Sequence, residues 1–260
     1  MTETPLTTLP RTRPALYSEV GADSARCERV LREELAGCSA DLHTLGFAPG
    51  TSGNVSARLD GARVLATPTG CSKRVIGPED VVVVDMDGRQ LAGVRHVTSE
   101  IDMHLAIYKA RPDVAAVVHA HPVFATAFAS SGLALDQPLC SEVVMTLGSI
   151  PLADYATTGT CEVRQTLAPY LQDHDAVLLA NHGVVTYGTS LMDALMKMET
   201  VEHFAQICSV TRQLGGGVML EGKHLSDLLR ARAAYMQRAG RRVYCPNGAN
   251  GGSTHAAQML

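Results

Sequence analysis

The sequence has no long block of lysine or arginine, and no apolar run approaches the roughly 20 residues needed to span a bilayer. Without a basic block, and with a formal net charge of −4, the chain is not expected to bind nucleic acid. Its Thr- and Pro-rich start lacks the charged beginning and apolar centre of a signal peptide. We therefore expect a cytoplasmic protein that does not bind membranes.

The cysteines form no Cys-x-x-Cys pair. They are seven in number and widely scattered, so neither a disulfide framework nor a structural zinc finger is indicated, and reduced thiols are expected. At 260 residues, 46% of them hydrophobic, the chain is long enough for one α/β domain over residues 21–245. Residues 1–20 are expected to form a flexible arm, and residues 246–260, rich in Gly, Asn and Ala, a flexible tail.

The most informative stretch runs from Thr98 to Pro122. Residues 114–118 form a Val- and Ala-rich run, typical of a buried strand, which leads into His119-Ala120-His121. Residues two apart on a strand face the same side, so the imidazoles of His119 and His121 are expected to project together. Such a pair can grip a transition metal such as zinc, although a His-x-His pair alone is more often a surface or core pair.

A third imidazole follows about sixty residues further on. Residues 175–180 are predicted to form a second buried strand, which ends in Asn181-His182-Gly183. Two strands that each carry histidine at their carboxyl end can bring His182 beside the first pair. Three protein ligands with an open position are typical of a catalytic rather than a structural zinc site.

Periodicity predicts further elements around these strands. Helices are expected over 23–46, 123–131, 160–173, 190–214 and 225–239, and strands over 64–67, 80–85 and within 142–158. Another helix is expected to begin at Thr98 and Ser99, with Glu100 in its first turn. Glu100 and His104 lie four residues apart and resemble a metal pair, but a surface or packing role is favoured for His104.

Two segments have features of anion sites. Residues 50–58 form a glycine-punctuated turn that enters a strand, but no Gly-Lys-Ser/Thr closes it as in a Walker A loop. Its backbone N–H groups can approach an anion, and an ordinary hairpin turn explains the pattern equally well. Thr98 and Ser99, at a helix N-terminus, can bind a phosphate or simply cap the helix.

Six motifs occur in order between about residues 25 and 240: Gly53-Asn54-Val55-Ser56, Pro68-Thr69-Gly70, Thr98-Ser99-Glu100, His119-Ala120-His121-Pro122, Tyr155-Ala156-Thr157 and Asn181-His182-Gly183. Each is unspecific alone. The ordered set resembles the class II aldolase/adducin family, which includes the fuculose-1-phosphate aldolases and the ribulose-5-phosphate 4-epimerases. The resemblance implies an α/β fold of three layers, with a central, mainly antiparallel sheet flanked by helices, and C4 homotetramers.

The resemblance also implies roles for individual residues. His119, His121 and His182 are expected to bind one Zn²⁺ per subunit, or Mn²⁺ or Co²⁺, and Glu100 to act as the acid/base residue and as a fourth ligand when no substrate is bound. The substrate is expected to be a phosphorylated sugar. Its phosphate pocket is expected to consist of Gly53, Asn54, Thr69, Gly70, Thr98 and Ser99.

The implied activity is cleavage of a ketose 1-phosphate to dihydroxyacetone phosphate and a short aldehyde. Where the fuculose-phosphate aldolases use tyrosines for protonation, this sequence has Cys140-Ser141-Glu142 and Ala239. The candidate proton donors are therefore Tyr155 and Glu142, with Tyr235 and Tyr244 as alternatives. The alternatives are a decarboxylase, dehydratase or sugar-phosphate epimerase of the same fold. A non-catalytic adducin-type interaction module is disfavoured, because it has no need for the three histidines and Glu100.

Overall fold

A computed structural model of the chain describes residues 24–238. The expected arm (1–20) and tail (246–260) lie outside these residues. The described part is built on an eight-stranded sheet of order β4-β3-β2-β1-β5-β8-β7-β6, antiparallel except for the β6–β7 pair. The expected mainly antiparallel sheet is therefore confirmed. Its strands are β1 (Asn54–Arg58), β2 (Arg63–Ala66), β3 (Val82–Asp85), β4 (Gln90–Ala92), β5 (Ala116–Ala120), β6 (Leu152–Ala153), β7 (Ala176–Leu179) and β8 (Gly183–Gly188).

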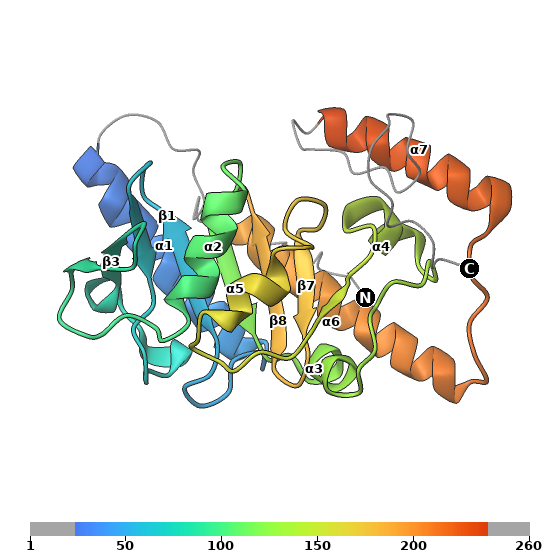
Figure 1. Cartoon of the computed structure of the whole chain (residues 1–260), viewed down its shortest axis with the longest axis horizontal. Helices are drawn as coiled ribbons and strands as arrows, with labels where there is room; N and C mark the ends of the chain where they lie inside the picture. Colours follow the sequence, from blue (N-terminus) through green and yellow to red (C-terminus); the bar gives the residue numbers. More distant parts are fainter. Residues whose placement is uncertain (1–23, 239–260) are drawn as a thin grey trace, which may run out of the picture.

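Helices cover both faces of the sheet, which gives the three layers (Figure 1). On one face pack α1 (Ser24–Thr44), α3 (Val123–Ser130) and α6 (Leu191–Gln213). On the other face pack α2 (Ile101–Ala110) and α5 (Glu162–Leu167). The remaining helices, α4 (Ser141–Thr146) and α7 (Gly222–Arg238), pack against each other beside the β6 end of the sheet (Figure 1). None of the helices in residues 24–238 is long and apolar enough to cross a membrane.

The central strand β5 shows how the alternation of side chains divides the two faces. Ala116, Val118 and Ala120 belong to the core beneath α1, α3 and α6, whereas Val117 belongs to the core beneath α2 and α5. His119 follows the same alternation and lies on the α2 face, fully buried. The strand therefore presents its first histidine to the layer that contains Glu100.

The segment 142–158 differs from the sequence prediction. It begins with helix α4, and only Leu152 and Ala153 join the sheet. The β-branched pair Val143 and Val144 favours a strand locally, but both side chains are buried on α4, so tertiary packing overrides the propensity. Strand β8, which the sequence did not reveal, pairs with both β5 and β7.

Candidate metal centre and active site

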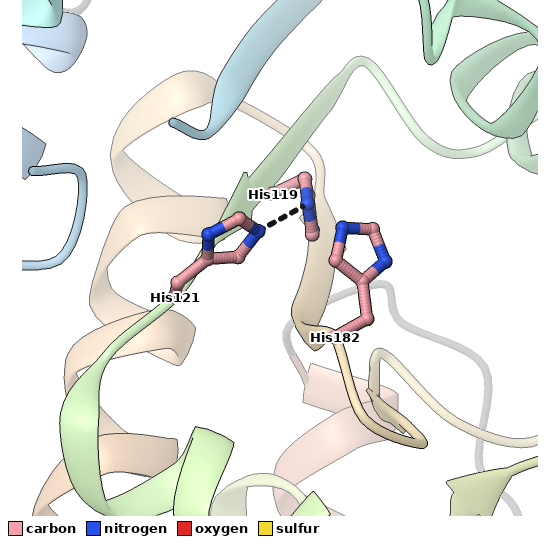
Figure 2. Close-up of side chains that lie close together, drawn as sticks. All are labelled: His119, His121 and His182. Carbon is pink, nitrogen blue, oxygen red and sulfur yellow. Dashed lines mark hydrogen bonds between the residues drawn. The ribbon is translucent and has the colours of Figure 1, made fainter. Parts of the chain in front are cut away.

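Three histidines from two parts of the sheet point toward one another (Figure 2). His119 belongs to β5, His121 follows that strand directly, and His182 lies in the turn between β7 and β8. The Nε2 atoms of His119 and His121 are 3.0 Å apart, and one ring nitrogen from each of the three residues lies within 4.8 Å of the others. The expected three-histidine cluster is thus formed in the structure.

The β7–β8 turn is shaped to deliver His182. Asn181 has φ 55°, in the left-handed region that asparagine tolerates better than most residues, and is the only non-glycine residue with positive φ in residues 24–238. Gly183 leaves room for its neighbours, because a Cβ there would lie 2.6 Å from the Ala120 carbonyl oxygen and 2.5 Å from Cδ2 of His121. The motif Asn181-His182-Gly183 therefore lets the turn approach β5 closely.

A hydrogen bond fixes the ring of His119 for metal binding. Its Nδ1 lies 2.8 Å from the backbone carbonyl oxygen of Val184, which can only accept, so Nδ1 carries the proton. In the neutral ring the lone pair is then on Nε2, the atom that faces the other histidines. Burial lowers the pKa of all three rings, that of His119 to about 3, and so favours the neutral form that binds metal. These residues fit a divalent transition metal.

Glu100 lies next to this cluster, at the start of α2. Its Oε2 is 3.3 Å from Nε2 of His119 and its Oε1 is 3.3 Å from Nε2 of His182. Burial favours the protonated acid, but His119, His182 and a 2.7 Å hydrogen bond from Nδ2 of Asn54 outweigh it and lower the pKa of Glu100. Glu100 is therefore a carboxylate within reach of any ion that the histidines hold.

The six residues expected in the phosphate pocket lie on three neighbouring loops. An isolated bridge between Pro68 and Val97 joins the turn of Thr69 and Gly70 to the segment of Thr98 and Ser99. The ammonium group of the buried Lys73 lies 2.7 Å from the carbonyl oxygen of Cys71 and 3.3 Å from that of Thr51, and so joins this turn to the loop before β1. Thr69, Gly70 and Ser99 are exposed, whereas Gly53, Asn54 and Thr98 are buried.

Three of these residues, all buried, already make contacts within the protein. Both ends of the Asn54 amide are hydrogen-bonded, to Glu100 and to His104. Gly53, at φ 72°, lies against β5, where a Cβ would be 2.9 Å from the His119 carbonyl oxygen. The Thr98 hydroxyl accepts a hydrogen bond from the Glu100 backbone N–H just before α2, but the helix has Glu100 as its N-cap and no side-chain capping bond, so the expected start at Thr98 and Ser99 is shifted to Ile101.

The two candidate proton donors do not join the cluster. Tyr155 is 61% exposed in the loop after β6, and Glu142 is exposed in the first turn of α4. In the described part of the chain, neither forms a hydrogen bond or ion pair with the histidines or with Glu100. The loop of Tyr155 nevertheless approaches the site, because a Cβ on Gly159 would lie 3.5 Å from the Ser99 carbonyl oxygen.

Sequence reasoning missed three residues behind Glu100. His104, favoured as a surface or packing residue, is fully buried and hydrogen-bonded to Asn54 and Ser56, and Ser56 contacts the hydroxyl of Tyr108. The signal was present in the spacing of Glu100, His104 and Tyr108, which recur every four residues and so share one face of α2. Asn54 on β1 is the cross-strand partner of His119 on β5, and this face of α2 lies over that part of the sheet.

Comparison with known proteins is consistent with this site. Residues 33–209 match the family model of the class II aldolase and adducin N-terminal domain. The chain is 37% identical over 190 residues to the 3-oxo-tetronate 4-phosphate decarboxylase of Escherichia coli K12, covering 72% of this chain and 89% of that protein. It is 32% identical over 209 residues to the 5-deoxy-D-ribulose 1-phosphate aldolase of Bacillus thuringiensis, covering 80% and 97%. The chain belongs to the class II aldolase family.

Solved structures agree with this assignment. An L-fuculose 1-phosphate aldolase structure matches with a TM-score of 0.73 at 30% identity, covering 79% of this chain and 96% of that one. The expected class II aldolase fold is therefore confirmed. The relatives include both aldolases and decarboxylases of phosphorylated substrates.

Proposed function

We propose that this protein is a metal-dependent aldolase that cleaves a ketose 1-phosphate to dihydroxyacetone phosphate and a short aldehyde. The observation that carries the proposal is the position of the Glu100 carboxylate, 3.3 Å from both His119 and His182 in a cluster of neutral imidazoles. This arrangement places a proton acceptor beside the ion that would polarise the substrate. His119, His121 and His182 would hold Zn²⁺, or Mn²⁺ or Co²⁺, one per subunit.

When bound, the ion would act as a Lewis acid on the carbonyl group of the substrate. The residues of the chain supply the proton transfers. Glu100 would accept the proton of the hydroxyl group on the carbon that becomes the aldehyde, and the carbon–carbon bond then breaks with its electrons left on the ketone fragment as an enediolate. The same carboxyl group would then give this proton to the enediolate carbon of the ketone fragment, which yields dihydroxyacetone phosphate. Asn54 would hold Glu100 in place throughout by its hydrogen bond to Oε2.

The substrate phosphate would bind at the three loops that Lys73 and the Pro68–Val97 bridge join. The backbone N–H of Thr69 is bonded to the His96 carbonyl oxygen, so the groups offered to an anion would be the hydroxyls of the exposed Thr69 and Ser99 and the backbone N–H groups of Gly70 and Ser99, with the buried lysine nearby. Gly53, Asn54 and Thr98 would shape the pocket from beneath. Tyr155, whose loop adjoins Ser99, and Glu142 remain the proposed proton donors to the aldehyde oxygen when the reaction runs in the reverse direction, as condensation.

Decarboxylation of a phosphorylated 3-oxo sugar acid is the second candidate. It is favoured by the 37% identical relative and by the lack, in residues 24–238, of a tyrosine bonded to the cluster. Loss of CO2 from such an acid leaves the same enediolate as aldol cleavage. No hydroxyl proton has to be removed, so Glu100 would first take up a proton from water and then deliver it to the carbon that lost CO2. The two reactions therefore require the same histidine cluster, but only the aldolase also needs a second acid, at the aldehyde oxygen.

The working form would be a cytoplasmic C4 homotetramer, as the family resemblance implies. Light scattering of the purified protein measures the number of subunits. A monomer that turns over substrate would contradict the tetramer without affecting the chemistry.

The deciding experiment is phosphorus NMR of the protein with dihydroxyacetone phosphate and a panel of short aldehydes, with and without a chelator. A new sugar-phosphate signal that the chelator abolishes would support the aldolase. In parallel, the protein is incubated with 3-oxo-tetronate 4-phosphate and the release of CO2 is measured. Metal-dependent CO2 release without any adduct would replace the aldolase by the decarboxylase, and neither product from a metal-loaded protein would refute both.

A further inference from the structure

A chain of hydrogen bonds runs from Glu100 into the layer between α2 and the sheet. Nδ2 of Asn54 lies 2.7 Å from Oε2 of Glu100, and Oδ1 of Asn54 lies 2.5 Å from Nε2 of His104. Nδ1 of His104 is 2.6 Å from the hydroxyl of Ser56, which is 2.9 Å from the hydroxyl of Tyr108. His104, Ser56 and Tyr108 are at most 1% exposed, so water does not substitute for any of these bonds.

The position of each proton in this series of hydrogen bonds follows from the Glu100 carboxylate, where the series begins. A carboxylate only accepts, so the Asn54 amide must direct its NH2 group to Glu100 and its oxygen to His104. The amide oxygen only accepts, so Nε2 of His104 must carry a proton. Burial lowers the pKa of His104 to about 3, hence the ring is neutral and its Nδ1 accepts from Ser56. Ser56 in turn accepts from Tyr108.

We infer that His104 is a positioning residue, which fixes the Asn54 amide with its NH2 group toward Glu100 and thereby holds the carboxylate at the metal cluster. Glu100 and His104 both favour this orientation of the amide, but among the described hydrogen bonds only His104 holds the oxygen end of Asn54. Without the imidazole N–H, the oxygen end of the amide would be buried without a donor, and Asn54 would hold Glu100 through a side chain fixed at one end only. The effect on turnover rests on the proposed function.

The spacing of residues on β1 and α2 explains how His104 can hold the Asn54 amide. Asn54 and Ser56 are two residues apart on β1 and face the same side of the sheet, while Glu100, His104 and Tyr108 share one face of α2. The two rows interlock, so that each β1 side chain bridges two α2 side chains. The chain of bonds therefore depends on the packing of one helix on one strand.

The first test reads the protons directly and needs no substrate. Two-bond ¹H–¹⁵N correlation spectra of the metal-free protein are recorded at neutral pH, with the His104 ring assigned by its loss in His104→Gln. We expect a neutral ring with the proton on Nε2, and one Asn54 NH2 proton shifted by its bond to Glu100. A proton on Nδ1 or a charged ring would overturn the inference.

The second test uses two replacements of similar size. His104→Gln keeps an N–H donor for Asn54, whereas His104→Leu removes it. With Leu we expect kcat to fall about 10- to 100-fold, with KM and zinc content unchanged and with the Asn54 NH2 signals altered; Gln should resemble the parent. Tyr108→Phe should also resemble the parent, because Ser56 still donates to His104.

Equal losses with Leu and Gln, or loss of zinc from the Leu variant, would show a merely structural role. If the parent turns over none of the substrates, the proposed function fails. The Asn54 signals still decide the inference in that case. Signals that are the same in the parent and in His104→Leu would refute it.

Discussion

Replacement of Gly183 by alanine should weaken metal binding from outside the ligand set. The new Cβ would lie 2.6 Å from the Ala120 carbonyl oxygen, about 0.8 Å inside ordinary contact, and 2.5 Å from Cδ2 of His121. The His121 ring can rotate away, but the Ala120 carbonyl belongs to the β5–β8 ladder and has little freedom. We expect a loss of about 1–3 kcal/mol in the free energy of unfolding and a 10- to 100-fold loss of zinc affinity, because His121 is displaced.

Competition with a chromophoric chelator measures the zinc affinity of Gly183→Ala, and urea unfolding measures its stability. The matched control is Gly37→Ala, because Gly37 lies inside α1 and a Cβ at this position would have no neighbouring atom within 4 Å. That variant should gain about 0.5–1 kcal/mol in stability with unchanged zinc affinity. If Gly183→Ala binds zinc as tightly as the parent, the absence of a side chain at Gly183 is not needed to position His121, and the reasoning is refuted.

Three further predictions concern single side chains. His121→Ala should lose both zinc and activity, measured by elemental analysis and turnover, while replacement of the exposed His203 should change neither. Burial lowers the pKa of His104 to about 3, so on acidification this residue takes up its proton in the unfolded chain before it does so in the folded protein. The free energy of unfolding should therefore fall below pH 6.5, by up to about 1.4 kcal/mol per pH unit for this residue. In urea titrations at several pH values, His104→Gln should lack this contribution to the slope, and equal slopes in parent and variant would contradict a buried neutral ring. Lys197→Met removes the ammonium group that pairs with the largely buried carboxylates of Asp175 and Asp193. Because Arg111 still pairs with Asp175, we expect a cost of about 3 kcal/mol in urea unfolding, against about 1 kcal/mol or less for Arg29→Ala in an exposed pair; similar costs would contradict this.

Elements with a strong local signal could be predicted from sequence. The long helices α1 and α6 and the buried strands β5 and β7 show clear periodicity or β-branched runs, and their positions agree with the expectations to within a few residues. The segment around α4 could not be read in this way, because its valines favour a strand and only its packing on α7 and the sheet makes it helical. Strand β6 has only two residues, too few for a pattern.

The three-histidine cluster could be predicted because each histidine stands at the end of a strand with a clear apolar pattern. The hydrogen-bond chain behind Glu100 could not, because Asn54 and Ser56 meet His104 only when β1 pairs with β5 and α2 covers that face. Spacing on α2 indicates which side chains share a face, but the partner of that face is a property of the assembled sheet.

The alternation along β5 has a consequence for how such a protein changes during evolution. Ala116, Val118 and Ala120 serve the core, while His119 serves the site from the opposite face of the same strand. Substitutions among the groups that surround the histidine cluster can therefore alter the chemistry of the site without disturbing the packing that keeps the sheet folded. A single scaffold can then pass from one lyase reaction to another by small steps, each of which leaves a stable protein.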